Sequence, residues 1–319
     1  MTAPDVLVLR QAVHGIPVSE YAAAISERLP DHEVVHARTP REERDLVQGA
    51  TVVTGQSLRE ELLDRAADLR LFACLYAGVD HLPLADLEAR GVAVTNASGV
   101  HGPNAAEWAI GQILVFARGL NTGWHRQERR EFRHFQAGEL EGSTVTVVGM
   151  GAIGEAVVER LSGFGVETIG VRHSPEKGGP ADEVVGYDEG DFHGALARTD
   201  YLVLACPLTE LTRGLVDAGA LETLPPTAVV LNLARGPVID TDALVASIRL
   251  SGIRGAALDV TDPEPLPPDH PLWTFENVLI TPHTAGQTPR YYERRADVLA
   301  ENVRALDAGE DAPLRNQVV

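Results

Sequence analysis

The segment spanning residues 144–154 constrains the fold of this chain more than any other part of the sequence. It contains a β-branched run typical of a buried strand, then Gly149, Gly151 and Gly154 in a Gly-x-Gly-x-x-Gly pattern, then an apolar helical stretch. The first glycine permits a tight turn, the second lets a pyrophosphate approach the backbone, and the third lets helix and strand pack closely. A structural strand–turn–helix can also carry this pattern. Its position between a strand and a helix nevertheless favours a dinucleotide-binding site.

Short apolar runs alternate with helical stretches on both sides of this motif. Candidate strands lie at residues 6–9, 33–35, 51–53, 71–75 and 92–94 before it, and at residues 167–171, 201–205, 228–232, 255–259 and 278–280 after it. Strands that alternate with helices predict parallel sheets. Because 319 residues exceed one average domain, we expect an α/β protein with two parallel-sheet domains. A closing helix at residues 289–308 has no strand after it and could cross back to the first domain.

Charge and composition exclude several classes of function. The formal net charge of −19 argues against nucleic acid or an anionic membrane as a partner. No stretch approaches the roughly 18 consecutive apolar residues of a membrane span, and the first residues lack the pattern of a signal peptide. Cys74 and Cys206 each end an apolar run, which is typical of buried thiols in a reducing compartment. We therefore expect a cytoplasmic protein without a metal site.

The residues after the glycine motif bear on the kind of dinucleotide. An acidic residue about 20 positions downstream usually holds the adenosine ribose hydroxyls. This chain has Arg172, His173 and Ser174 there, with Lys177 close behind. Arginine, serine and lysine side chains can bind a 2′-phosphate that a carboxylate would repel. The sequence therefore favours NADP(H) over NAD(H); the alternative is a solvated loop in a protein that uses NAD(H).

Three polar residues follow candidate strands of the second domain. Arg235 comes after the run 228–232, Glu264 lies in the loop after 255–259, and His283 comes after 278–280. An arginine can orient an anionic substrate, a histidine can transfer a proton, and a glutamate can fix the histidine tautomer. Singly, Glu264 could be a solvated loop residue and His283 a structural histidine. Together, beside the nicotinamide end of a dinucleotide, they predict a catalytic constellation.

The loops after the strands of the first domain are the candidate substrate side. Residues 76–80, Tyr-Ala-Gly-Val-Asp, follow the run 71–75. A glycine with exposed backbone amides can bind a small anion without a cationic side chain. A tight turn into the next helix fits the same residues equally well. Residues 14–15 and 55–57 lie in similar loops and could help to set substrate preference.

A charged and aromatic segment lies between a predicted helix at residues 104–117 and the glycine motif. Residues 124–135 interleave Trp124, Phe132 and Phe135 with arginines and histidines. Such a run is usually a solvated face. The aromatic residues could equally be packed into a subunit interface, so the sequence leaves both interpretations open.

Taken together, these motifs resemble the D-isomer-specific 2-hydroxyacid dehydrogenase family, which includes glyoxylate/hydroxypyruvate reductases and D-3-phosphoglycerate dehydrogenase. The resemblance covers essentially the whole chain and is densest at residues 76–80, 105–107, 149–154, 207–209, 212–214, 232–240, 259–266 and 281–286. It implies an α/β fold of two Rossmann-like or flavodoxin-like parallel-sheet domains. The NAD(P)-binding domain, residues 99–286, would be inserted into a substrate domain formed by residues 1–98 and 287–319.

The resemblance also implies residue roles. Arg235, Glu264 and His283 fall on the catalytic residues of the family, and the backbone at Gly78 and Val79 falls on its substrate-carboxylate loop. The other substrate-side candidates are Tyr76, Ala77 and His101. The cofactor-side candidates are Gly149, Met150, Gly151, Ala152, Ile153, Gly154, Arg172, His173, Ser174, Cys206, Pro207, Thr212, Leu233, Ala234, Arg235, Asp259, His283, Ala285 and Gly286. Among them, Asp259 falls on the residue that holds the nicotinamide carboxamide.

The activity implied is NAD(P)-dependent interconversion of a small 2-keto acid and its D-2-hydroxy acid, by a homodimer built on the cofactor domain. Two positions depart from many family members: Arg172 replaces an aspartate and His101 replaces an asparagine. Two alternatives share this scaffold. Formate dehydrogenases resemble the family but use glutamine where Glu264 stands. Dinucleotide-sensing corepressors keep the triad, although the acidic charge disfavours that interpretation.

Overall fold

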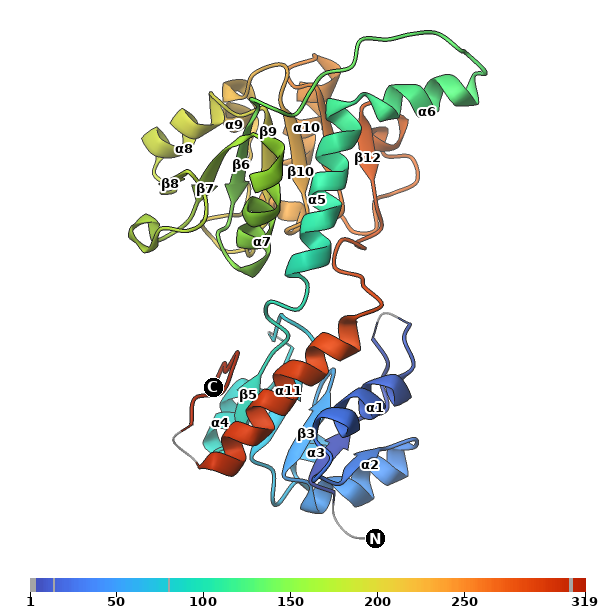
Figure 1. Ribbon diagram of the computed structural model, residues 1–319, viewed down its shortest axis with the longest axis vertical. Helices are drawn as coiled ribbons and strands as arrows, with labels where there is room; N and C mark the ends of the chain where they lie inside the picture. The colour runs from blue at the N-terminus through green and yellow to red at the C-terminus, as the bar shows by residue number, and fades with distance from the viewer. Residues whose placement is uncertain (1–3, 14, 80, 310–311) are drawn as a thin grey trace. The chain divides into compact units, whose positions relative to one another are not determined.

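The computed structural model describes residues 4–13, 15–79, 81–309 and 312–319. The chain divides into two compact units (Figure 1). Unit 1 comprises Met1–Val100 and Gln287–Val319, and unit 2 comprises His101–Gly286. Each unit is built on one parallel sheet with helices on both faces. The prediction of an α/β fold with two parallel sheets is therefore confirmed.

The sheet of unit 1 has five parallel strands in the order β2-β1-β3-β4-β5. The strands are β1 (Val6–Val8), β2 (Val34–His36), β3 (Val52–Gly55), β4 (Leu71–Cys74) and β5 (Ala93–Thr95). The helices are α1 (Val18–Arg28), α2 (Pro40–Leu46), α3 (Glu60–Leu63), α4 (Leu84–Ala89) and α11 (Tyr291–Ala308). Alternate strand residues bury opposite faces of the sheet: Val6 and Val8 pack with α1 and α11, and Leu7 packs on the other side.

The sheet of unit 2 has seven parallel strands in the order β12-β11-β10-β9-β6-β7-β8. The strands are β6 (Thr144–Val148), β7 (Glu167–Val171), β8 (Glu183–Val185), β9 (Tyr201–Leu204), β10 (Val229–Asn232), β11 (Gly255–Leu258) and β12 (Val278–Ile280). The helices are α5 (Gly102–Ala117), α6 (Leu120–Glu128), α7 (Ala152–Leu161), α8 (Glu189–Leu196), α9 (Ala218–Thr223) and α10 (Thr241–Arg249). The strand order reverses between β6 and β9, which is where ligands bind in open α/β sheets.

Two apolar layers stabilise unit 2, one on each face of its sheet. Val145 and Val147 of β6 pack against α5 and α7, while Val148 faces the layer formed with α8, α9 and α10. Strands buried on both faces have the near-continuous apolar character that the sequence shows. The sequence did not predict β8, an edge strand of three half-buried residues.

None of the helices in the described ranges combines the length and the apolar character that crossing a membrane requires.

Candidate active site

The glycine motif leaves open space at the start of α7. Gly149 has a φ of +98°, and a Cβ built on it would lie 2.6 Å from backbone atoms of Cys206. A Cβ on Gly154 would lie 2.0 Å from the Gly149 carbonyl oxygen, whereas a Cβ on Gly151 would meet no atom within 4 Å. Packing therefore requires the first and third glycines, and the second faces open space beside the N-terminal amides of α7. This geometry fits a bound pyrophosphate.

A cleft of about 710 Å³ lies next to this opening. Its walls come from the ends of β6 and β7 and from the loop after β9, and the residues are Gly149, Met150, Gly151, Arg172, His173, Ser174, Lys177, Tyr187, Pro207, Thr209, Glu210, Leu211 and Thr212. The structure thus brings most predicted adenosine-side residues to one cleft. Tyr187 and Leu211 were not predicted, because no sequence motif distinguishes an apolar loop residue that lines a cleft from one that is solvated.

The loop after β7 is ordered by its own backbone. Arg172 is half-buried, and its Nη1 donates a hydrogen bond of 2.5 Å to the Gly178 carbonyl. His173 and Lys177 are exposed, and Ser174 is half-buried. The loop therefore presents a guanidinium, a hydroxyl and an ammonium group to the cleft.

The loop after β9 forms the opposite wall of the cleft and includes the exposed carboxylate of Glu210. Cys206 is buried, and burial raises the pKa of its thiol to about 11, so the thiol stays protonated near neutral pH. Thr212 is also buried, and its Oγ1 donates to the Pro207 carbonyl at 2.6 Å while accepting from the Thr209 amide at 2.8 Å. These bonds fix the loop that forms this wall.

Arg235 follows β10 on a turn that Asn232 holds. The Asn232 side chain donates to the Arg235 carbonyl at 3.0 Å and accepts from the Ala234 amide at 3.0 Å. The Arg235 side chain is exposed, and its Nη1 donates to the Ala234 carbonyl at 2.7 Å. A Cβ on Gly236 would lie 2.0 Å from the Thr261 carbonyl oxygen, so the turn packs directly against the loop that leads to Glu264.

Asp259 organises the segment that carries His283. Its carboxylate is 3% exposed and accepts three hydrogen bonds, from Thr281 Oγ1 (2.6 Å), the Thr284 amide (2.8 Å) and the Ala285 amide (2.8 Å). Trp108 Nε1 in turn donates to Thr281 Oγ1 at 3.1 Å. A buried carboxylate is stable only when hydrogen-bonded in this way. Asp259 therefore has a clear structural role beside the cofactor role that the sequence predicted.

His283 and Glu264 form a hydrogen-bonded pair in unit 2. Nδ1 of His283 lies 2.8 Å from Oε1 of Glu264, and the two side chains are 50% and 43% exposed. An ionised carboxylate can only accept, so Nδ1 carries the proton in this hydrogen bond and Nε2 takes no part in it. The His283 backbone has a φ of +54°, an uncommon value for a non-glycine residue, and its amide donates to the Asp259 carbonyl at 2.8 Å.

The remaining predicted residues of unit 2 lie at the end of the same segment. His101 precedes α5 and is half-buried, with Nδ1 2.7 Å from the Gly286 carbonyl oxygen. Asn104 Nδ2 donates to the Ala285 carbonyl at 2.9 Å. The start of α5 is thus joined to residues 281–286. No group of three or more histidine, cysteine, aspartate or glutamate side chains in the described parts of the chain could hold a metal ion.

The predicted substrate loop belongs to unit 1 and follows β4. Tyr76, Ala77 and Gly78 are exposed and Val79 is half-buried. His14 and Asp80, which the sequence analysis also placed in candidate loops, lie outside the described residues.

Comparisons with known proteins agree with this arrangement. Residues 110–285 match the family model described as D-isomer specific 2-hydroxyacid dehydrogenase, NAD binding domain. A glyoxylate reductase from Thermofilum pendens is 36% identical over 262 residues, which are 79% of this chain and 76% of the relative. The chain belongs to the D-isomer specific 2-hydroxyacid dehydrogenase family.

Further members of the 2-hydroxyacid dehydrogenase family extend the likeness to both units. D-3-phosphoglycerate dehydrogenase from Methanocaldococcus jannaschii is 30% identical over 92% of this chain and 57% of its own length. A D-isomer specific 2-hydroxyacid dehydrogenase from Xanthobacter autotrophicus Py2, solved in complex with NADPH and MES, is 29% identical. It covers 99% of this chain and 98% of its own, with a TM-score of 0.81. The protein is thus an enzyme of this family with a nicotinamide dinucleotide as cofactor.

Proposed function

We propose that this protein interconverts a small 2-keto acid and its D-2-hydroxy acid, with His283 as the proton donor and acceptor. The observation that carries the proposal is the 2.8 Å pair between His283 Nδ1 and Glu264 Oε1. The pair follows strands of the same sheet whose β6 end carries the glycine opening. The bound nicotinamide supplies or accepts the hydride in this chemistry.

The orientation of the His283 ring determines which nitrogen transfers the proton in our proposal. In the reductive direction the carbonyl carbon gains a hydride and the carbonyl oxygen gains the proton from Nε2 of His283. Glu264 holds Nδ1–H and stabilises the charged ring before the proton leaves. In the oxidative direction Nε2 accepts the hydroxyl proton. Asp259 keeps the His283 segment in place through three hydrogen bonds and, in our proposal, also faces the nicotinamide carboxamide.

We propose that Arg235 of unit 2 and the amides of Gly78 and Val79 of unit 1 are carboxylate-binding groups. The Arg235 guanidinium is exposed at the end of β10 and carries donors that suit a carboxylate. The amides of Gly78 and Val79 follow β4 in unit 1. Unit 1 would accordingly be the substrate domain and unit 2 the cofactor domain. Tyr76 and His101 are proposed to shape the substrate side.

We further propose that the preferred cofactor is NADP(H). Arg172, Ser174 and Lys177 line the cleft where a ribose 2′-phosphate would bind, and the loop between β7 and β8 that carries them provides a guanidinium, a hydroxyl and an ammonium group. The relative from Xanthobacter autotrophicus Py2 was solved with NADPH, which supports the assignment.

The proposal also includes the cellular location and the oligomeric state of the protein. Cys74 and Cys206 are free and buried, which fits a reducing compartment, and we propose a cytoplasmic location. We also propose a homodimer formed through an arm of unit 2, residues 118–137. No residue of α6 within this arm is buried, and Phe132 is fully exposed.

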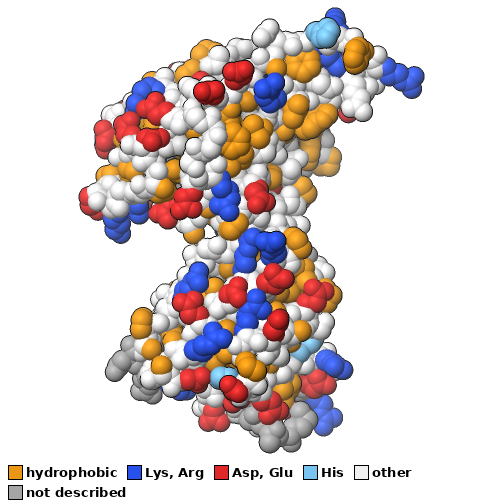
Figure 2. Space-filling model, in the orientation of Figure 1, with side chains coloured by type: hydrophobic (Ala, Val, Ile, Leu, Met, Phe, Trp, Pro, Cys, Tyr) orange, Lys and Arg blue, Asp and Glu red, His pale blue; other side chains and the backbone are white. Residues whose placement is uncertain are grey.

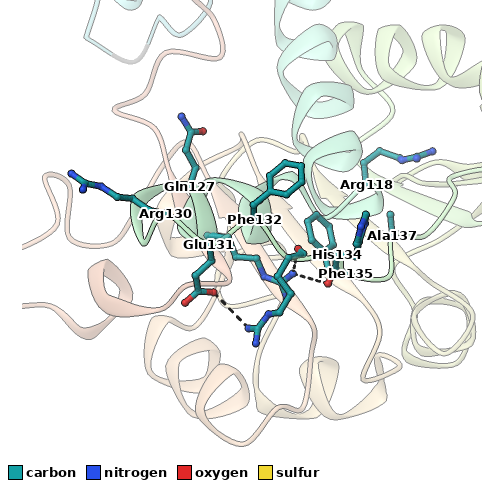
Figure 3. Close-up of a pocket in the computed structure, with 11 residues that line it drawn as sticks. Arg118, Gln127, Arg130, Glu131, Phe132, His134, Phe135 and Ala137 are labelled. Carbon is teal, nitrogen blue, oxygen red and sulfur yellow. Dashed lines mark hydrogen bonds and ion pairs between the residues drawn. The ribbon is translucent and has the colours of Figure 1, made fainter.

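The arm has a defined shape although it projects from unit 2. Arg126 Nη1 donates to the carbonyls of Arg133 (2.6 Å) and His134 (2.9 Å), and its guanidinium lies 5.0 Å from the centroid of the Phe135 ring. Figure 2 shows apolar, basic and histidine side chains exposed together at this end of unit 2. Phe132, Phe135 and Arg118 border a pocket of about 590 Å³ (Figure 3). An ordered, exposed apolar surface of this kind is typical of an interface.

The test of the proposed activity is turnover of a panel of 2-keto acids, including glyoxylate and hydroxypyruvate, with NADPH and with NADH. The oxidation of the nicotinamide is followed by absorbance. We expect saturable turnover of at least one 2-keto acid, with NADPH preferred. Tight NADPH binding without turnover of any member of the panel would instead indicate a dinucleotide sensor and overturn the proposal.

A further inference from the structure

The substrate loop of unit 1 is held through its carbonyl groups. Four consecutive backbone carbonyls, those of residues 74–77, each accept a hydrogen bond from another part of the unit. The donors, in the order of the acceptors, are Arg295 Nη2 (2.8 Å), Tyr291 Oη, the Ala97 amide (3.0 Å) and Asn96 Nδ2 (2.8 Å). Two of these donors come from α11, the helix that returns to unit 1 at the end of the chain.

The amides of residues 77–79 in the same loop, in contrast to its carbonyls, are not used in hydrogen bonds between described residues. Residues 77 and 78 are also exposed. Consecutive unpaired amides on a fixed loop form an anion-binding concavity. The carbonyls of the loop are thus hydrogen-bonded within the protein, and these amides are available to a ligand. A carboxylate needs such hydrogen-bond donors because it can only accept.

Arg295 is unusual among the donors because it is a fully buried cation. Its side chain is 0% exposed, and Nη1 donates to the Asn96 carbonyl at 2.9 Å. Its Nε has no partner, and no carboxylate in the described residues forms an ion pair with it. Burial raises the pKa of the neighbouring Tyr21 phenol and Cys74 thiol, so both stay neutral near pH 7.

A buried charge without a counter-charge is unfavourable, and a neutral donor could hold the same carbonyls at lower cost. Hydrogen bonding to these carbonyls therefore does not explain why the side chain at residue 295 is charged. A cation in a low-dielectric core exerts its field on the nearest surface that water does not fully screen. The nearest such surface is the loop with the unpaired amides, which follows the Cys74 carbonyl that Arg295 binds.

We propose that Arg295 is a positioning residue for the substrate carboxylate, and this inference rests on the proposed function. It fixes the backbone that leads into residues 76–79, and its unpaired charge strengthens the unpaired amides as an anion site. Arg295 has no carboxylate partner among the described residues. In this proposal the substrate carboxylate, bound on the other side of the loop, provides the opposite charge. Arg295 would thereby favour 2-keto acids over uncharged 2-keto compounds.

The test compares kcat/KM for pyruvate, or the best acid of the panel, with kcat/KM for its neutral amide. Arg295→Gln keeps hydrogen-bond donors but removes the charge, so the acid-to-amide ratio should fall about tenfold, which corresponds to roughly 1.4 kcal/mol. Arg295→Lys keeps the charge and should preserve most of the ratio. Tyr291→Phe removes a neutral donor and should lower both values without changing their ratio. An unchanged ratio in Arg295→Gln would overturn the proposal.

A variant on a half-buried side chain covers the case in which Arg295→Gln does not fold. Asn96→Asp leaves Arg295 intact and places a negative charge next to the carbonyl that it binds. Because it also removes the Nδ2 donor to the Ala77 carbonyl, Asn96→Leu, which removes that donor without adding a charge, is its control. The same fall in the acid-to-amide ratio is expected in Asn96→Asp relative to this control, and a retained ratio would contradict the role of the Arg295 charge.

A binding measurement separates this inference from the proposed activity. Oxalate is titrated into protein labelled with ¹⁵N-glycine, and the Gly78 signal is assigned with Gly78→Ala. We expect the signal to shift with oxalate, and Arg295→Gln to need about tenfold more oxalate. If the signal shifts although no 2-keto acid is turned over, the activity is wrong and the anion site stands. If turnover is observed but Arg295→Gln binds oxalate normally, the role of Arg295 is wrong.

Discussion

The two sheet edges of this enzyme present their chemistry in opposite ways. In unit 2 the groups are side chains on exposed turns: Arg235, Glu264 and His283 each follow a different strand. In unit 1 the groups are backbone amides, and Arg295, whose charged side chain bonds to the Cys74 carbonyl at the start of the loop, is buried. Side-chain chemistry can be recognised from residue types, whereas backbone chemistry depends on which carbonyls and amides the fold leaves unpaired.

The largest expected effect tests the side-chain edge. His283→Asn should lower kcat/KM for the 2-keto acid by about 10³-fold, because it removes the general acid. NADPH binding should change little. His32→Asn is the matched control, since it removes a second histidine–carboxylate pair, with Asp307 at 3.0 Å, in unit 1. Steady-state kinetics that show near-normal turnover in His283→Asn would exclude the proton-donor role.

The next effect concerns the carboxylate on the unit 2 side. Arg235→Ala should raise KM for the 2-keto acid by about 10- to 100-fold, as expected for the loss of a charge-assisted hydrogen bond. Arg249→Ala, which alters an exposed arginine of α10, serves as the control. A normal KM in Arg235→Ala, measured at saturating cofactor, would show that Arg235 does not bind the substrate carboxylate.

A smaller effect is expected at the adenosine end of the cleft. Arg172→Ala should reduce the preference for NADPH over NADH by about tenfold, because one charged partner of the 2′-phosphate is lost. The measurement is the ratio of kcat/KM for the two cofactors. A wild-type enzyme that prefers NADH would refute NADP(H) use at once, and an unchanged ratio in the variant would refute the role of Arg172.

The smallest effect on chemistry is expected from the arm. Phe132→Glu should shift the dimer toward the monomer, because it places a charge on the exposed apolar surface. Sedimentation velocity measures this shift. Leu250→Glu changes a residue that is 81% exposed elsewhere on unit 2 and should leave the assembly intact. A wild-type monomer, or a Phe132→Glu dimer as stable as the wild type, would contradict an interface at this arm.

The comparison between the edges also explains how far the sequence could be interpreted. The strand–glycine–helix unit was predictable because steric constraints act locally: Gly149 and Gly154 have no room for a Cβ. The pairing of Glu264 with His283 was expected from their positions after parallel strands, and the structure places them 2.8 Å apart. Their catalytic role stays a prediction.

Other features depend on contacts that no local pattern encodes. Arg295 comes from α11, yet it binds the carbonyl of Cys74, 221 residues earlier in the chain. Helical spacing predicts only that its helix packs, and an arginine there would ordinarily be taken as exposed. The three bonds of Asp259 and the edge strand β8 were missed for the same reason, because each is defined by neighbours brought in by the fold.

The most direct test of the central claim is the chirality of the product. Pyruvate or hydroxypyruvate is reduced to completion with the preferred nicotinamide, and the 2-hydroxy acid is resolved by chiral chromatography. We predict the D isomer alone, formed in a quantity equal to the cofactor oxidised. An L or racemic product, or cofactor oxidation without a 2-hydroxy acid, would contradict the proposed function.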